Sequence, residues 1–120
     1  MTIDANIIIA YLAGEKEVIE TLSHFRQEGK ILLLPTVVEA EVLSFSAWTK
    51  EECFATELFL GENFTSIPFD RHIAKIAAEI RRETKLKFPD AAIAATALFT
   101  NTPLGTRNIR DFKKVPGLSL

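Results

Sequence analysis

Short apolar segments alternate with helical patterns along this 120-residue chain, and the alternation restricts the fold to few classes. Parallel strands need long crossover connections, usually helices, so the pattern predicts an α/β fold on a parallel sheet. We expect one domain over residues 1–120, an α/β/α sandwich with a short central parallel sheet of four to five strands. The expected strands are residues 2–4, 31–34, 64–69, 103–106 and 118–120.

Helices are expected wherever apolar residues recur at three- and four-residue spacing. In the helix predicted over 35–47, Glu41 falls among Val37, Val38 and Phe45, which would place its carboxylate on the buried face. Glu39 would face solvent. The other predicted helices cover 6–12, 15–27, a segment capped by Thr49 and ending before Gly61, a segment capped by Asp70, 91–99 and 108–113.

Composition favours an ordinary globular protein, with 48% apolar and 25% charged residues. No stretch approaches the length of a membrane-spanning helix, and no basic residues precede the first apolar run as in a secretory signal. Cys53 is the only cysteine, so no intramolecular disulfide can form, and we interpret it as a small buried side chain. A cytoplasmic location is therefore expected.

The two ends of the chain carry opposite charge. Residues 1–70 have a net charge of −8, whereas residues 71–120 have a net charge of +6. One interpretation is two differently solvated surfaces. The other is a basic region that attracts a polyanion toward acidic groups supplied by both halves.

Acidic residues recur where strands end and helices begin. Asp4 follows the first expected strand, Asp90 opens a helix after a proline, and Asp111 lies beyond the fourth strand. Because the ends of parallel strands share one edge, these residues, Glu41 and Asn108 are expected to converge. Alone, each has a simpler interpretation: Asp90 is a helix-start residue, Glu41 pairs with an arginine, and Asp111 is a surface charge.

Several carboxylates at one place repel one another unless a cation lies between them. An all-oxygen ligand set favours Mg²⁺ or Mn²⁺, and without histidine or cysteine it disfavours zinc. His24 and His72 lie on predicted helices without a carboxylate motif and are interpreted as surface residues. Asp70 is interpreted as a helix cap.

Four segments together resemble the conserved blocks of PIN-domain proteins, most closely the VapC-like toxins of toxin–antitoxin pairs. They are Asp4-Ala5-Asn6, Pro35-Thr36-Val37-Val38-Glu39-Ala40-Glu41-Val42-Leu43, Phe88-Pro89-Asp90-Ala91-Ala92-Ile93-Ala94-Ala95-Thr96-Ala97 and Thr106-Arg107-Asn108-Ile109-Arg110-Asp111-Phe112. The resemblance implies a metal-dependent endoribonuclease that leaves a 5′ phosphate and a 3′ hydroxyl. Asp4, Glu41 and Asp90 match the family's acidic triad and would hold the metal.

The last segment departs from the family pattern. Where relatives often carry a fourth acidic residue, this chain has Asn108, although Asn also occurs there in relatives, and Asp111 would replace the acid through a water molecule. Asn6 and Thr106 match accessory polar positions beside the metal. The basic residues expected to bind flanking RNA phosphates are Arg107, Arg110, Lys113, Lys114, Lys85 and Lys87.

The resemblance also implies a homodimer and a cognate antitoxin laid over the active-site groove. The side chains of Phe45, Trp48, Phe54, Leu58 and Phe59 are partly assigned to the core and partly to an antitoxin or dimer surface. The alternative function is a non-catalytic RNA- or partner-binding regulatory domain with a degenerate site, which Asn108 keeps open. A receiver domain and a haloacid-dehalogenase phosphatase are disfavoured, the latter because Asn6 interrupts the required Asp-x-Asp.

Overall fold

A four-stranded parallel sheet lies at the centre of the computed structural model, in the order β3-β2-β1-β4. The strands are β1 (Thr2–Ile3), β2 (Leu33–Pro35), β3 (Thr65–Ile67) and β4 (Leu104–Gly105). Thr2 of β1 lies opposite Leu33 on one side and Leu104 on the other. β3 occupies an edge, as the proline after it predicted.

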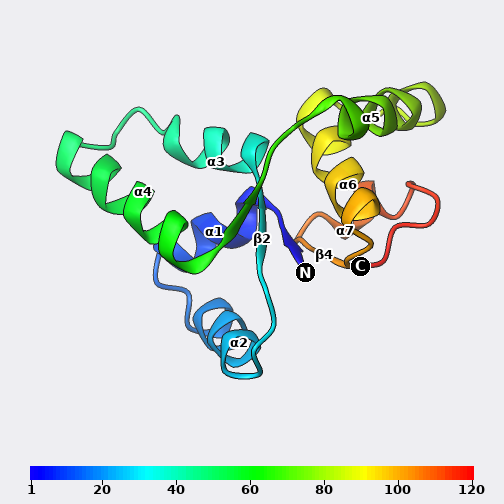
Figure 1. The fold of residues 1–120 in the computed structure, drawn as a ribbon. Coiled ribbons are helices and arrows are strands. Elements are labelled where there is room, and N and C mark those ends of the chain that lie inside the picture. Colours follow the sequence, from blue (N-terminus) through cyan, green and yellow to red (C-terminus); the bar gives the residue numbers. More distant parts are fainter.

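Seven helices flank this sheet. They are α1 (Ala5–Leu12), α2 (Lys16–Gln27), α3 (Thr36–Leu43), α4 (Lys50–Asn63), α5 (Arg71–Glu83), α6 (Phe88–Thr100) and α7 (Ile109–Phe112). In Figure 1, helices α1 to α4 lie on one side of β2, and α5 and α6 lie on the other. The predicted α/β/α architecture is confirmed, with four strands.

Helix α6 forms the centre of one layer because its side chains are small. Every residue from Ala91 to Ala97 is buried. Five of these seven are alanines, which allow close approach to β1, β2 and α5. This packing fixes the first turn of α6, which carries Asp90, against the edge where the strands end.

The observed strands are shorter than predicted, and two predictions differ in more than length. The second strand is Leu33–Pro35 rather than 31–34, and Ile31 is 64% exposed instead of buried on both faces. Residues 118–120 form no strand, because Pro116 and the left-handed Gly117 (φ +79°) turn the chain just before them. One hydrogen bond, from Leu104 N–H to the Ser119 carbonyl (2.8 Å), is all that joins this end to β4.

The helix predicted over 35–47 is shorter than expected, and Glu41 is exposed rather than on its buried face. Hydrogen bonds from Ser44 Oγ to the Glu41 carbonyl (2.9 Å) and from Trp48 Nε1 to the Val42 carbonyl (3.0 Å) satisfy the last turn. Such side-chain bonds end a helix. Val38 and Val42 are buried in α3, whereas Phe45 lies beyond it.

Smaller differences concern side chains and helix ends. Cys53 and Glu39 are half-buried, although the first was expected in the core and the second in solvent. α4 continues through Gly61 to Asn63, and α6 begins at Phe88, before the predicted start. The capping box of Thr49 with Glu52 and the cap of Asp70 on Ile73 N–H are confirmed. No helix is long and apolar enough to cross a membrane.

Candidate active site

Asp4 is the buried centre of the candidate site. It follows β1 directly and caps α1, with Oδ1 accepting a hydrogen bond from Ala5 N–H at 2.7 Å. Its own N–H donates to the Gly105 carbonyl of β4 at 2.9 Å. Only 5% of Asp4 is exposed, and no lysine or arginine pairs with it. The first strand and first helix therefore hold a buried carboxylate at the sheet edge.

Thr106, just after β4, holds the other oxygen of Asp4. Its hydroxyl donates to Asp4 Oδ2 at 2.7 Å and accepts from Asn108 N–H at 3.0 Å and from Asn6 Nδ2 at 3.4 Å. One donated and two accepted bonds use the full capacity of a hydroxyl group. These contacts hold Asp4, near the N-terminus, against the loop that follows β4 near the C-terminus.

Asn6 and Asn108 extend this network. Asn6 Oδ1 accepts from Arg107 N–H at 3.2 Å, so the Asn6 amide holds two consecutive residues of the loop after β4. Asn108 donates from Nδ2 to Asp111 Oδ2 at 3.1 Å. The structure thus brings Asn6, Thr106 and Asn108 to Asp4 and joins Asp111 to them.

Glu41 and Asp90 approach the same place from α3 and α6. Partial burial raises the pKa of Glu41 above its ordinary 4.5, and the charges of Asp4 and Asp90 raise it further. Partial burial also raises the pKa of Asp90 above 3.8, as do Asp4 and Asp111, while Lys87 opposes the shift. Asp4, Glu41 and Asp90 therefore lie near enough for each charge to disfavour ionisation of its neighbours.

The predicted metal-binding set, Asp4, Glu41 and Asp90, fits a divalent cation only in part. All candidate ligands are oxygens, and no basic side chain forms an ion pair with Asp4, Glu41 or Asp90, which suits Mg²⁺ or Mn²⁺. No three His, Cys, Asp or Glu side chains are close enough to bind one ion together. Because Mg²⁺ commonly keeps several waters and takes only one or two carboxylates, Asp4 and Asp90 with waters suffice.

The basic residues predicted to bind RNA differ in their surroundings. Arg110, Lys113 and Lys85 are exposed and form no ion pair. Lys114 lies 4.0 Å from Asp111, and Arg107 lies 2.7 Å from Glu15. Arg107 is therefore the rim cation with the closest acidic partner.

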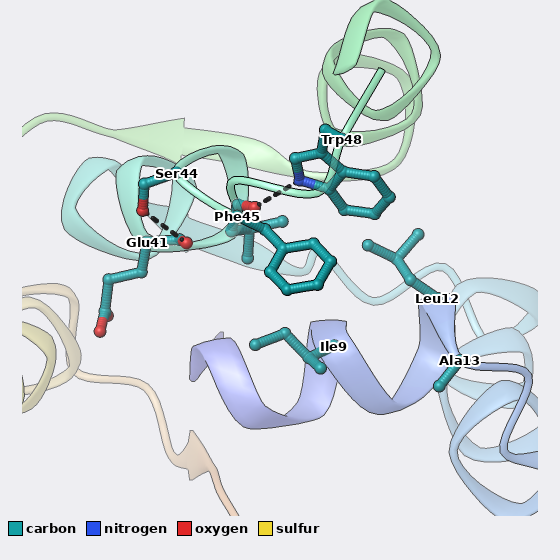
Figure 2. Close-up of a pocket in the computed structure, with 8 residues that line it drawn as sticks. Ile9, Leu12, Ala13, Glu41, Ser44, Phe45 and Trp48 are labelled. Atoms are coloured by element: carbon teal, nitrogen blue, oxygen red, sulfur yellow. Dashed lines mark hydrogen bonds between the residues drawn. The ribbon is translucent and has the colours of Figure 1, made fainter. Parts of the chain in front are cut away.

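An apolar groove of about 430 Å³ borders the carboxylates. It lies between α1 and the segment from α3 to Trp48, and Figure 2 shows Phe45 facing Ile9 and Leu12 across it. Ile9 is 55% exposed and Phe45 60% exposed, so large apolar side chains face solvent here. Glu41 lies at one end, with its carboxylate directed away from the apolar side chains in Figure 2.

Sequence reasoning identified Phe45 and Trp48 of this groove but missed Ile9 and Leu12. The available signal was the composition of α1, Ala-Asn-Ile-Ile-Ile-Ala-Tyr-Leu, which is too apolar for a helix with one buried face. Glu15 was missed as well. An isolated surface glutamate gives no sign of a partner 92 positions away in the chain.

Family and structure comparisons support the same architecture. The model of the PIN domain family matches residues 1–118. No curated protein matches the chain significantly.

Among solved structures, VapBC2 from Rickettsia felis bound to a promoter DNA fragment has a TM-score of 0.86 and 23% identity, covering 99% of this chain and 95% of that one. A toxin–antitoxin complex from Klebsiella pneumoniae has a TM-score of 0.81 and 30% identity, with the same coverage of 99% and 95%. VapBC-1 from nontypeable Haemophilus influenzae has a TM-score of 0.83 and 21% identity, covering 98% and 93%.

Proposed function

Because the chain belongs to the PIN domain family, we propose that it is a Mg²⁺- or Mn²⁺-dependent endoribonuclease and the toxin of a cytoplasmic toxin–antitoxin pair. The observation that carries the proposal is the negative charge at the sheet edge, which no ion pair neutralises and Lys87 offsets only in part. Asp4, Glu41 and Asp90 repel one another there, and no basic side chain pairs with them. A divalent cation would relieve this repulsion.

The chain's own residues have distinct tasks in this proposal. Asp4 and Asp90 would hold the ion together with bound waters, Glu41 would act on it from α3 without direct coordination, and Thr106 and Asn6 keep Asp4 in place. When bound, the ion would polarise a phosphate oxygen and lower the pKa of a bound water. Arg110, Lys113 and Lys85 would bind the flanking RNA phosphates, because their charges are exposed and unpaired.

Matched acid-to-amide substitutions test the nuclease proposal. Asp4→Asn, Asp90→Asn and Glu41→Gln should each abolish Mg²⁺-dependent cleavage of an RNA pool, read by sequencing the new 5′ ends. Asp70→Asn is the control for the aspartates because asparagine caps a helix as well as aspartate does. Glu39→Gln is the control for Glu41. Full cleavage by a folded Asp4→Asn or Asp90→Asn variant would refute the assigned site.

The same site leaves a second candidate function, a PIN-like domain that binds RNA or a partner without cutting. Two observations favour it: no three acidic side chains lie at direct coordinating distance, and Asn108 replaces an acid and bonds to Asp111 instead. Calorimetric titration with Mg²⁺ separates the two functions. Metal binding with no cleavage of any RNA pool supports the regulatory domain.

We propose that a segment of the antitoxin binds in the apolar groove. An amphipathic helix placing apolar side chains against Ile9, Leu12 and Phe45 would also cover Glu41 at the end of the groove. Ile9→Ser and Phe45→Ser should weaken co-purification with the antitoxin, whereas Phe54→Ser, exposed on α4 outside the groove, should not. An equal loss of co-purification in all three variants would argue against this binding site. The proposed homodimer is tested by light scattering of the purified chain.

A further inference from the structure

Glu15 is held in place just beyond the C-terminal end of α1. Gly14 adopts a left-handed conformation (φ +83°) and donates its N–H to the Tyr11 carbonyl at 3.0 Å, while Glu15 N–H donates to the Ala10 carbonyl at 3.1 Å. This pair of bonds is a Schellman motif, which fixes the direction of the chain after a helix. The backbone of Glu15 is therefore fixed by α1.

The side chain of Glu15 is not used by its own helix. Glu15 occupies the N-cap position of α2, yet it makes no capping hydrogen bond. Instead, its Oε2 lies 2.7 Å from a terminal nitrogen of Arg107. Arg107 also donates its backbone N–H to Asn6 in the first turn of α1. Arg107 thus links the start of α1 with the residue just beyond its end.

Resting on the proposed function, we infer that Glu15 is a positioning residue that lowers RNA affinity by competing with phosphate for Arg107. The pair is about half exposed on both sides, with side-chain exposures of 50% and 46%. Exposed ion pairs contribute little to stability, so a phosphate can displace the glutamate. A guanidinium group binds phosphate through two parallel hydrogen bonds. A carboxylate that contacts one of its nitrogens leaves only part of these donors free.

The contrast with the other rim cations supports this assignment. Arg110, Lys113 and Lys85 carry no acidic partner and Lys114 makes only a 4.0 Å contact with Asp111, whereas Arg107 has a 2.7 Å partner from the opposite end of the chain. Arg107 is also adjacent to Thr106, the residue that holds Asp4. The backbone of Arg107 is therefore anchored to the network around Asp4.

A double-mutant cycle tests the inference by direct binding. Each variant is made in the Asp90→Asn background, and the Kd of a fluorescein-labelled, mixed-sequence single-stranded RNA is measured by anisotropy. Glu15→Gln should tighten binding about two- to fivefold, the range expected for an exposed pair. It should have no effect when Arg107→Gln is also present. Glu17→Gln is the control, since it removes the same charge two residues away without an ion-pair partner.

Equal tightening with and without Arg107 would overturn the inference, because the effect would then be general charge removal. Weaker or unchanged binding in Glu15→Gln would overturn it too, as would RNA binding that Arg107→Gln does not alter. Cleavage by the chain with active-site aspartates intact is assayed separately. Coupling in binding without any cleavage would refute the nuclease proposal and leave this inference standing, whereas cleavage without coupling would do the reverse.

Discussion

Replacing Thr106 by valine removes the hydroxyl that holds Asp4 while nearly preserving the shape of the side chain. The variant loses the bond to Asp4 Oδ2 (2.7 Å), the bond from Asn108 N–H (3.0 Å) and the long contact from Asn6 (3.4 Å). A hydrogen bond to a charged group contributes about 1.5–3 kcal/mol and a neutral one about 0.5–1.5 kcal/mol. Because Thr106 is only half-buried, water replaces part of this, and we expect a net loss of about 2 kcal/mol.

Urea unfolding of the metal-free protein measures this loss. With an m value of about 2 kcal/mol/M, the midpoint of Thr106→Val should fall by about 1 M. Thr106→Ser keeps the hydroxyl and loses only a methyl group, so its midpoint should fall by less than half as much. If the valine and serine variants unfold at the same urea concentration, the Thr106 hydroxyl does not hold Asp4 and its hydrogen bonds add no stability.

Three further predictions concern charge, metal and backbone. The pKa of Asp90 is raised in the folded protein, so this carboxyl contributes stability at pH values below its ordinary pKa of 3.8. That contribution is lost as the pH rises through the raised pKa, because the folded protein then carries the charged carboxylate. Asp90→Asn should therefore stabilise the metal-free protein at neutral pH and not at pH 3, as measured by urea unfolding; a constant difference would contradict the assigned charges. Millimolar Mg²⁺ should raise the Tm of the unmodified protein and not of an Asp4→Asn, Asp90→Asn double variant, by scanning calorimetry; equal shifts would place the ion elsewhere. Gly14→Ala should destabilise by about 1–2 kcal/mol because φ is +83°, whereas Gly61→Ala inside α4 should stabilise by about 0.5–1 kcal/mol; similar effects at both sites would contradict the assigned backbone conformations.

Most of the architecture could be predicted because its local signals agree. Gly14 and Gly29 follow predicted helices and both have positive φ, as expected where helices end. Thr49 and Asp70 cap the helices that their side chains indicated. A parallel sheet covered by helices is the arrangement that agrees with the alternation of short apolar runs and helical patterns.

One error occurs where side chains just beyond a helix satisfy the backbone groups of its last turn. Periodicity extends α3 through Phe45, but Ser44 and Trp48 bond to the carbonyls of its last turn and end it early. The buried residues of α3 end at Val42, and Glu41 is exposed instead of buried. The spacing of apolar residues gives no information about side chains that bond to the backbone of a helix and end it.

The proximity of Asp4 to the loop after β4 could be predicted from the sequence, but the bonds between them could not. A parallel sheet brings Asp4 and the loop after β4 to one edge, so their proximity follows from topology. The bonds that organise them join residues about 100 positions apart, including Thr106 to Asp4 and Asn6 to Arg107. The pairing of Glu15 with Arg107 has no sequence signal, because both residues are ordinary surface charges.

Helix α1 explains why the candidate site and the apolar groove lie together in so short a chain. Ile8 is buried in the core, Ile9 lines the apolar groove, and Asn6 belongs to the network around Asp4. Glu41 lies both in the lining of the groove and within the electrostatic reach of Asp4. A protein segment that fills the groove must therefore contact a carboxylate of the candidate site. Inhibition by such a segment requires no change in the fold, because covering Glu41 already closes one side of the place where RNA would bind.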